Sequence, residues 1–171
     1  MRKVLLAAAL VAASCGGSPM EPSTGAPSSA ASLASGSYVL TVSMSTSGTS
    51  GFSSCLSLTA GGAPPAFAAV IVPVPVQVER VGNNVTITPD DPSATFRMQL
   101  QIAGAALSGT ASGQYRSSAT PITVTGRSSD APAAVSGTIG VNSAAGALEG
   151  TVGVDALSCT NNGHGWMLRS R

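Results

Sequence analysis

The sequence contains little charge. Its 171 residues include 8 lysines and arginines and 7 aspartates and glutamates, which give a formal net charge of +1. Nucleic-acid binding is usually driven by a clustered basic face, and the scattered arginines of this chain form no run, so we expect no nucleic-acid partner. A charged fraction of 9% also disfavours coiled coils and helical bundles, which are rich in Glu, Lys, Arg and Leu. The length corresponds to one domain of ordinary size.

Reactive side chains are equally scarce. His164 is the single histidine, and its Asn-Asn-Gly-His-Gly setting is typical of a solvated turn residue. No Gly-x-Ser-x-Gly elbow precedes a predicted helix, as a serine hydrolase of the α/β type would require. Asp90 and Asp91 lie between two prolines, where turn chemistry accounts for them, whereas a calcium site normally needs about six or more oxygen ligands. We predict a protein that is not an enzyme and that holds no metal or cofactor.

The sequence also lacks a continuous apolar run of about 20 residues, the length that spans a bilayer as a helix. Val4–Ala13 is a short apolar run behind Arg2 and Lys3, and this combination is typical of an export signal. A later apolar stretch, residues 66–78, is interrupted by Pro73 and Pro75. We therefore expect a signal peptide over residues 1–14 and no membrane-spanning helix after it.

The junction Ala12-Ala13-Ser14-Cys15 resembles the lipobox of bacterial lipoproteins, with Ala12 where that family prefers Leu. The resemblance implies cleavage directly before Cys15, lipid attached to Cys15, and a membrane anchor that consists of this lipid. It also implies a place in the cell envelope. Gly16 follows the cysteine where enteric inner-membrane lipoproteins carry Asp, which favours the outer membrane.

Residues 16–35 are dominated by Gly, Ser, Pro and Ala. Such a stretch has too little apolar bulk to offset the entropy lost when a chain becomes ordered, so it predicts a flexible tether. The expected organisation is a signal peptide over residues 1–14, a lipidated cysteine and tether over 15–36, and a folded domain over 37–171.

The expected domain alternates apolar and polar residues with a period of two, which is the pattern of half-buried strands. Tyr38, Leu40, Val42 and Met44 share one face of the first such segment. A second clear segment carries its apolar side chains at Phe96, Met98, Leu100 and Ile102. We predict an all-β fold, an antiparallel up-and-down meander of about eight to ten short strands. It should form a closed or nearly closed barrel, with a β-sandwich as the alternative.

A short pattern, apolar-x-Gly-Thr, occurs at residues 107–110, 135–138 and 148–151. Because the three copies do not share a carboxylate, we interpret the glycines as positions where barrel strands coil or pack closely. The succession of these Gly-Thr segments along the chain resembles that of avidin-like barrels. Gly36-Ser37-Tyr38 is similar to the lipocalin Gly-x-Trp motif, with Tyr in place of Trp. The ending Cys159…Gly165-Trp166-Met167-Leu168-Arg169 looks like that of other small bacterial lipoproteins. These resemblances imply an architecture and no particular binding residue.

Cys55 and Cys159 remain after Cys15 is assigned to lipid. An even pair of cysteines in an exported domain predicts a disulfide, which would join the first and last parts of the meander.

Two functions are compatible with the sequence. The first is a lipid-anchored, non-catalytic envelope component that acts through contacts with other envelope proteins. The second is a module that binds a small apolar ligand inside the barrel. The residues of the expected ligand pocket are Tyr38, Leu40, Val42, Phe96, Met98, Leu100 and Trp166.

Overall fold

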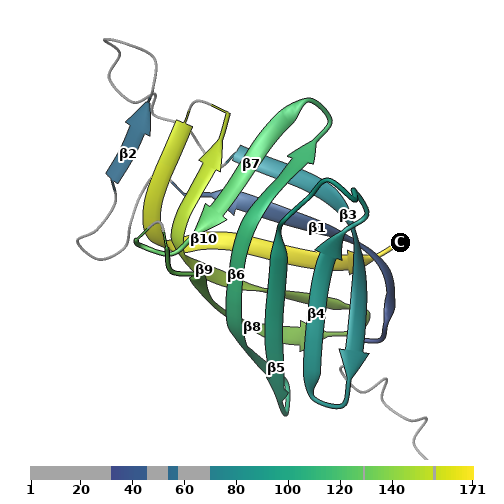
Figure 1. Ribbon diagram of the computed structural model, residues 1–171. Helices are drawn as coiled ribbons and strands as arrows, with labels where there is room; N and C mark the ends of the chain where they lie inside the picture. Colours follow the sequence, from purple (N-terminus) through teal and green to yellow (C-terminus); the bar gives the residue numbers. More distant parts are fainter. Residues whose placement is uncertain (1–31, 46–53, 58–69, 129, 156) are drawn as a thin grey trace, which may run out of the picture.

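The computed structural model describes residues 32–45, 54–57, 70–128, 130–155 and 157–171, and in these ranges the chain forms strands and no helix (Figure 1). The predicted lipidation site, Cys15, and the predicted signal peptide lie outside the described residues. The strands are β1 (Gly36–Met44), β2 (Ser54–Ser57), β3 (Val70–Val81), β4 (Asn84–Pro89), β5 (Arg97–Ala103), β6 (Ala106–Ser117), β7 (Thr120–Thr125), β8 (Ala133–Gly140), β9 (Ser143–Val154) and β10 (Leu157–Ser170). The part of the chain that the structure describes contains no helix that could serve as a membrane span.

The antiparallel pairings close into a ring. From β1 the hydrogen-bonded neighbours run through β3, β4, β5 and β6, then through β7 and β8 to β9 and β10, and β10 pairs with β1 again. In Figure 1 the strands in front, β4 to β6, run steeply across β1, β8, β9 and β10 behind them. Because β10 joins β9 to β1, the sheet curls round on itself. The predicted all-β, barrel-like fold is therefore confirmed.

The ring is uneven at β7 and β8, which share one interval between β6 and β9. β7 pairs with the last part of β6 and with the end of β9, whereas β8 pairs with the first part of β6 and the start of β9. Both strands run antiparallel to β6, so they follow each other in the same direction along this interval. Together they act as one strand that is interrupted by residues 126–132.

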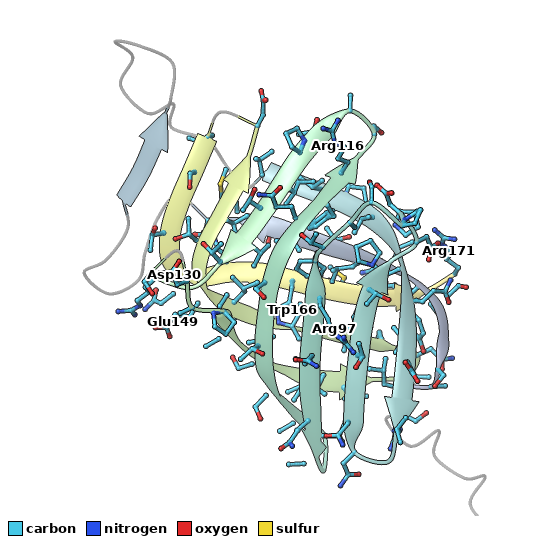
Figure 2. All side chains as sticks on the ribbon, viewed as in Figure 1. Arg97, Arg116, Asp130, Glu149, Trp166 and Arg171 are labelled. Carbon is cyan, nitrogen blue, oxygen red and sulfur yellow. The ribbon has the colours of Figure 1, made fainter. Side chains whose placement is uncertain are left out.

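The strands alternate between an apolar inner face and a polar outer face. On β5, Met98 and Leu100 are buried, while Arg97, Gln99 and Gln101 are exposed. In Figure 2 the labelled arginines lie on the outside of the barrel, and the Trp166 label lies over its middle. The buried residues of the other strands join these in a single core.

Pro73 and Pro75 lie in the first half of β3, which pairs with β1 on one side, whereas β4 pairs only with the segment from Val76 onward. The prolines therefore fall on a locally free edge, as the sequence suggests, since proline cannot donate to a ladder. The Pro73 carbonyl accepts a hydrogen bond from Ser117 Oγ (2.8 Å), and the Pro75 carbonyl accepts one from the Asp90 amide (3.0 Å). These two bonds satisfy carbonyl groups that the ladder leaves free.

The packed part of the chain begins before β1. Leu33, within the segment expected to be a tether, is fully buried in the core. Ser32 forms a parallel bridge with Val141, and Arg80 Nη1 donates to the Leu33 carbonyl (3.0 Å). Residues 32–36, which the sequence assigned to the tether, thus pack with the described strands. A lone leucine among Gly, Ser and Ala has no period that would reveal its burial.

Candidate functional site

The residues of the expected ligand pocket come together in the barrel interior. Each is at most 3% exposed, and all belong to the same core cluster; they are Tyr38, Leu40, Val42, Phe96, Met98, Leu100 and Trp166. The sequence therefore identified inward-facing positions correctly. Whether these residues also receive a ligand depends on how they pack with their neighbours.

Trp166 lies against two glycines of neighbouring strands. It is paired in register with Gly146, which in turn is paired with Gly137. A Cβ atom on Gly137 would lie 2.6 Å from Trp166 Cζ2 and 2.5 Å from the Ala145 carbonyl oxygen. The Trp166 indole also donates to the Ser136 carbonyl (3.0 Å). The indole thus fills the space left by the missing side chain, and the close-packing role predicted for the Gly-Thr pattern applies at Gly137.

The most polar part of the interior is a bulge in β10 that the sequence did not reveal. The expectation of a solvated turn at His164 is wrong: His164 is fully buried and Asn161 is 2% exposed. Both lie within β10, where the register with β9 shifts between them. Cys159 and Trp166 are seven residues apart, so a regular strand would point them to opposite faces. Both are buried, which requires an irregularity between them, and this spacing is the signal that could have located the bulge.

The bulge lies where β10 changes partners along one edge. β1 pairs with residues 165–170 of β10, and β2 pairs with residues 157–160. Between these two ladders, side chains replace backbone pairing. The Ser45 amide donates to His164 Nδ1 (3.0 Å), and Asn161 Nδ2 donates to the Ser45 carbonyl (3.2 Å). The two side chains therefore hold both backbone polar groups of the residue that follows β1.

These contacts fix the protonation state of His164. Because Nδ1 accepts a hydrogen bond, the imidazole proton must reside on Nε2. Nε2 lies 3.2 Å from the Gly150 carbonyl oxygen and 3.1 Å from the Cys159 carbonyl oxygen, and donates to them. Burial lowers the pKa of His164 below its ordinary value, although the two carbonyls act in the opposite direction. His164 is thus held as a neutral structural group, with both ring nitrogens engaged.

Tyr115 is the second unusual polar group of the interior. Its ring packs edge to face against Phe96, with ring centroids 5.1 Å apart. Its hydroxyl is buried and has no hydrogen-bond partner among the residues that the structure describes, and burial raises the pKa of Tyr115 far above its ordinary value. An unsatisfied buried hydroxyl is destabilising. The Tyr115 hydroxyl therefore either lowers the stability of the fold or donates a hydrogen bond to a bound ligand.

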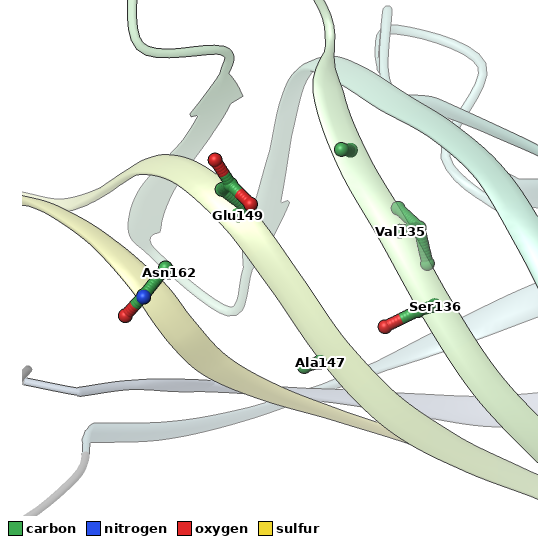
Figure 3. Close-up of a pocket in the computed structure, with 6 residues that line it drawn as sticks. Val135, Ser136, Ala147, Glu149 and Asn162 are labelled. Carbon is green, nitrogen blue, oxygen red and sulfur yellow. The ribbon is translucent and has the colours of Figure 1, made fainter. Parts of the chain in front are cut away.

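Three of the surface depressions that described residues form are lined by none of the seven expected pocket residues. Their volumes are about 160, 280 and 270 Å³, each below the roughly 300 Å³ at which ligand pockets usually begin. The smallest is bordered by Glu149 of β9 and Asn162 of the bulge (Figure 3). Glu149 forms an ion pair with Arg127, and both side chains are about half exposed.

Asp90 and Asp91 do not converge on a common point. Asp91 accepts hydrogen bonds from the amide and the hydroxyl of Ser93, both at 2.8 Å, and these bonds lower the pKa of its carboxyl group. Asp90 instead binds Gln77 (3.0 Å) and Arg171 (3.4 Å). Among the described residues, no group of three or more His, Cys, Asp or Glu side chains is placed to hold a metal ion.

β2 brings the backbones of the two remaining cysteines together. In the β2–β10 register, Cys55 lies directly opposite Cys159. Directly opposed residues of antiparallel strands have Cα atoms about 4.5 or 5.5 Å apart, and both separations fall within the range that a disulfide spans. Cys159 itself is fully buried.

Comparison with protein-family models, with curated proteins and with solved structures finds no match for this chain. The resemblances to bacterial lipoproteins and to avidin-like and lipocalin-like barrels therefore rest on sequence motifs alone.

Proposed function

We propose that this chain is a lipid-anchored protein of the cell envelope, assigned to the outer membrane by Gly16, that acts through protein contacts and not through catalysis. The observation that carries the proposal is the sequence around Cys15: a basic head, a short apolar run and the Ala-Ala-Ser-Cys junction. Attached acyl chains would provide the membrane affinity.

The outer surface of the barrel supports anchoring by lipid. On β5 the outward residues Arg97, Gln99 and Gln101 are exposed and polar, and the apolar residues face inward. Barrels that cross the outer membrane show the opposite arrangement, with an apolar band facing the lipid. The polar outer face of β5 is not suited to contact with lipid chains, so lipid on Cys15 would provide the membrane contact instead.

The interior supports a non-catalytic role. His164, the single histidine of the chain, uses both ring nitrogens to hold backbone groups. A general base needs a ring nitrogen that can take a proton from a substrate. His164 is therefore better suited to structural support than to catalysis.

Metabolic labelling with an alkyne-bearing fatty acid tests the anchor. We expect label on the wild-type protein and none on Cys15→Ser, with the variant retained as an uncleaved precursor. A Cys159→Ser variant controls for acylation at another cysteine and should label like wild type. An unlabelled wild-type protein that is cleaved and released in soluble form would overturn the proposal.

The alternative function, binding of a small apolar ligand inside the barrel, is favoured by one observation, the unpartnered hydroxyl of Tyr115. A ligand with a hydrogen-bond acceptor would satisfy this group. Native mass spectrometry of protein purified from its own membranes tests the idea, because a retained ligand adds a discrete mass. A Tyr115→Phe variant should then lose that mass, whereas identical ligand-free spectra for both proteins would contradict the alternative.

We further propose a disulfide between Cys55 and Cys159. Its support is the direct opposition of these residues in the β2–β10 register. The bond would attach β2 covalently to the strand that completes the ring.

A further inference from the structure

Three tight hairpins turn at one end of the barrel, which we call the hairpin end. The turn residues are Gly82-Asn83 between β3 and β4, Gly104-Ala105 between β5 and β6, and Val141-Asn142 between β8 and β9. Gly82 and Gly104, at the first turn positions, have positive φ angles of 62° and 63°, and Asn142, at the second position of its turn, has one of 50°; positive φ angles are common in tight turns. None of the six turn residues is charged.

The exposed apolar side chains gather toward this same end. Among the described residues, the large hydrophobic side chains that are exposed are Val81 (66%), Val141 (56%) and Met167 (36%). Val81 and Val141 adjoin or form hairpin turns, and Met167 lies opposite Ala145, close to the β8–β9 turn. Isolated exposed valines are ordinary, and what distinguishes Val81 and Val141 is that they lie at two hairpin turns of the same end of the barrel.

Positive side chains outnumber negative ones beside the hairpin turns. The described aspartates all lie in connections away from the hairpin end: Asp90 and Asp91 between β4 and β5, Asp130 between β7 and β8, and Asp155 between β9 and β10. Two arginines stand beside the hairpin turns. Arg80 precedes Val81, and Arg169 is paired with Ser143 at the start of β9. Exposed Glu79 lies two residues before Val81 on β3, so the charged side chains beside the hairpin turns are two arginines and one glutamate, whereas the described aspartates lie elsewhere.

The N-terminal segment joins the barrel at this end. Ser32 bridges to Val141, the Arg80 amide donates to Ser35 Oγ (2.9 Å), and Arg80 Nη1 donates to the Leu33 carbonyl (3.0 Å). Residues 32–35 thus run between the β8–β9 and β3–β4 turns. Sixteen residues, 16–31, separate Cys15 from Ser32, and a chain of that length reaches at most about 60 Å.

We infer that the hairpin end rests on a lipid surface that contains anionic headgroups, the same membrane that holds Cys15. The inference depends on the lipid anchor proposed above. Val81 and Val141 enter the headgroup region, and Arg80 and Arg169 meet the negative charge. Glu79 reduces this attraction but does not reverse its sign, because the two arginines outnumber it. Each contact alone is weak, but the anchor keeps the barrel within reach of the surface, so that docking becomes an intramolecular step.

Contact quenching by brominated lipids tests this orientation. The full-length lipidated protein is placed in vesicles of phosphatidylethanolamine and phosphatidylglycerol, with a tryptophan added as Val81→Trp or Val141→Trp. Buried Trp166 provides a constant background. We expect brominated lipid to remove most of the emission that either added tryptophan contributes. Ala119→Trp, in the exposed β6–β7 turn at the opposite end, should keep its emission.

Tryptophan itself prefers membrane interfaces, so an added tryptophan could draw the barrel to the lipid. A second measurement therefore uses the protein without added tryptophan. Hydrogen exchange of the amides at residues 104 and 105 should slow several-fold on vesicles for the wild-type protein, and the double variant Val81→Asp, Val141→Asp should lose this protection. The matched Val81→Thr, Val141→Thr variant should lose less.

The two proposals fail in different ways. A protein that does not float with the vesicles at all would overturn the lipid anchor. A protein that floats but shows equal quenching at positions 81, 141 and 119, or unchanged exchange at residues 104 and 105, would overturn the docking of the hairpin end and leave the anchor intact.

Discussion

The imidazole of His164 on β10 holds the backbone amide of Ser45, the residue that follows β1, through a 3.0 Å hydrogen bond to Nδ1. The two residues are 119 positions apart in the chain. The bond can form only while Nδ1 carries no proton, because a protonated Nδ1 would face an N–H group with no acceptor between them. The junction of β1 and β10 therefore depends on a neutral histidine.

This dependence predicts that the protein loses stability in mild acid. Since burial lowers the pKa of His164 in the folded state below the ordinary histidine value of about 6.5, the unfolded chain binds the proton first as pH falls. Neutral His164 contributes fully to the free energy of unfolding above about pH 6.5. Below that pH its contribution declines by up to about 1.4 kcal/mol per pH unit, until the folded-state pKa of His164 is reached. Urea unfolding at pH 7.5 and 5.5 measures the effect.

His164→Gln is the control for this titration, because glutamine can still accept and donate hydrogen bonds but does not ionise in this range. The chain has a single histidine, so the variant should show a nearly flat stability between pH 7.5 and 5.5. An equally flat profile in the wild-type protein would refute the neutral-histidine junction.

The two tyrosines provide a matched pair of substitutions to phenylalanine. Tyr38 donates to the Ala34 carbonyl at 3.0 Å, so Tyr38→Phe should lower the free energy of unfolding by about 1 kcal/mol. The Tyr115 hydroxyl is buried without a partner, so Tyr115→Phe should leave stability unchanged or raise it by up to about 1 kcal/mol. Chemical denaturation gives both values, and a clear loss for Tyr115→Phe would indicate a hydrogen bond to that hydroxyl.

Gly137 and Gly153 offer a similar comparison. A Cβ at Gly137 would lie 2.6 Å from Trp166 Cζ2 and close to backbone on β9, whereas the nearest atom to a Cβ at Gly153 is 3.6 Å away. Gly137→Ala should therefore destabilise the protein by about 1–3 kcal/mol and shift the Trp166 fluorescence. Gly153→Ala should be close to neutral; equal losses in the two variants would contradict the close packing at Trp166.

The proposed disulfide predicts a cross-linked peptide that joins residue 55 to residue 159 in the oxidised protein. Cross-linking positions this far apart stabilises by about 4–5 kcal/mol in chain-entropy models, so reduction should lower the unfolding midpoint strongly. Mass spectrometry of unreduced digests checks the bond, with the Cys159→Ala variant as the reference for the reduced state. Two thiols that react with a labelling agent in the freshly exported protein would disprove it.

Much of this architecture is readable from local patterns. The alternation Tyr38-Leu40-Val42 and Met98-Leu100 specifies which side chains face inward, because a strand presents every second residue to the same face. This is why the expected pocket residues all lie in the core. The resulting list says nothing about whether space remains between them.

The parts that could not be predicted depend on contacts between distant segments. The partner of His164 is Ser45, and no local pattern connects the two. Leu33 is buried because the β3–β4 and β8–β9 turns lie beside it, although its own neighbours are Gly, Ser and Ala. The sharing of one interval by β7 and β8 likewise follows from β6 and β9, since both are long enough to pair with two short strands in succession.

Because β7 and β8 lie one after the other between β6 and β9, the chain makes a detour between them. Residues 126–128 leave the wall of the barrel and residues 130–132 return to it, and the Gly126 amide donates to the Ala131 carbonyl at 2.6 Å. The detour therefore starts and ends at nearly the same place. A guest peptide grafted into it would not alter the register of the surrounding strands, which makes this position the natural site for displaying a foreign epitope on the barrel.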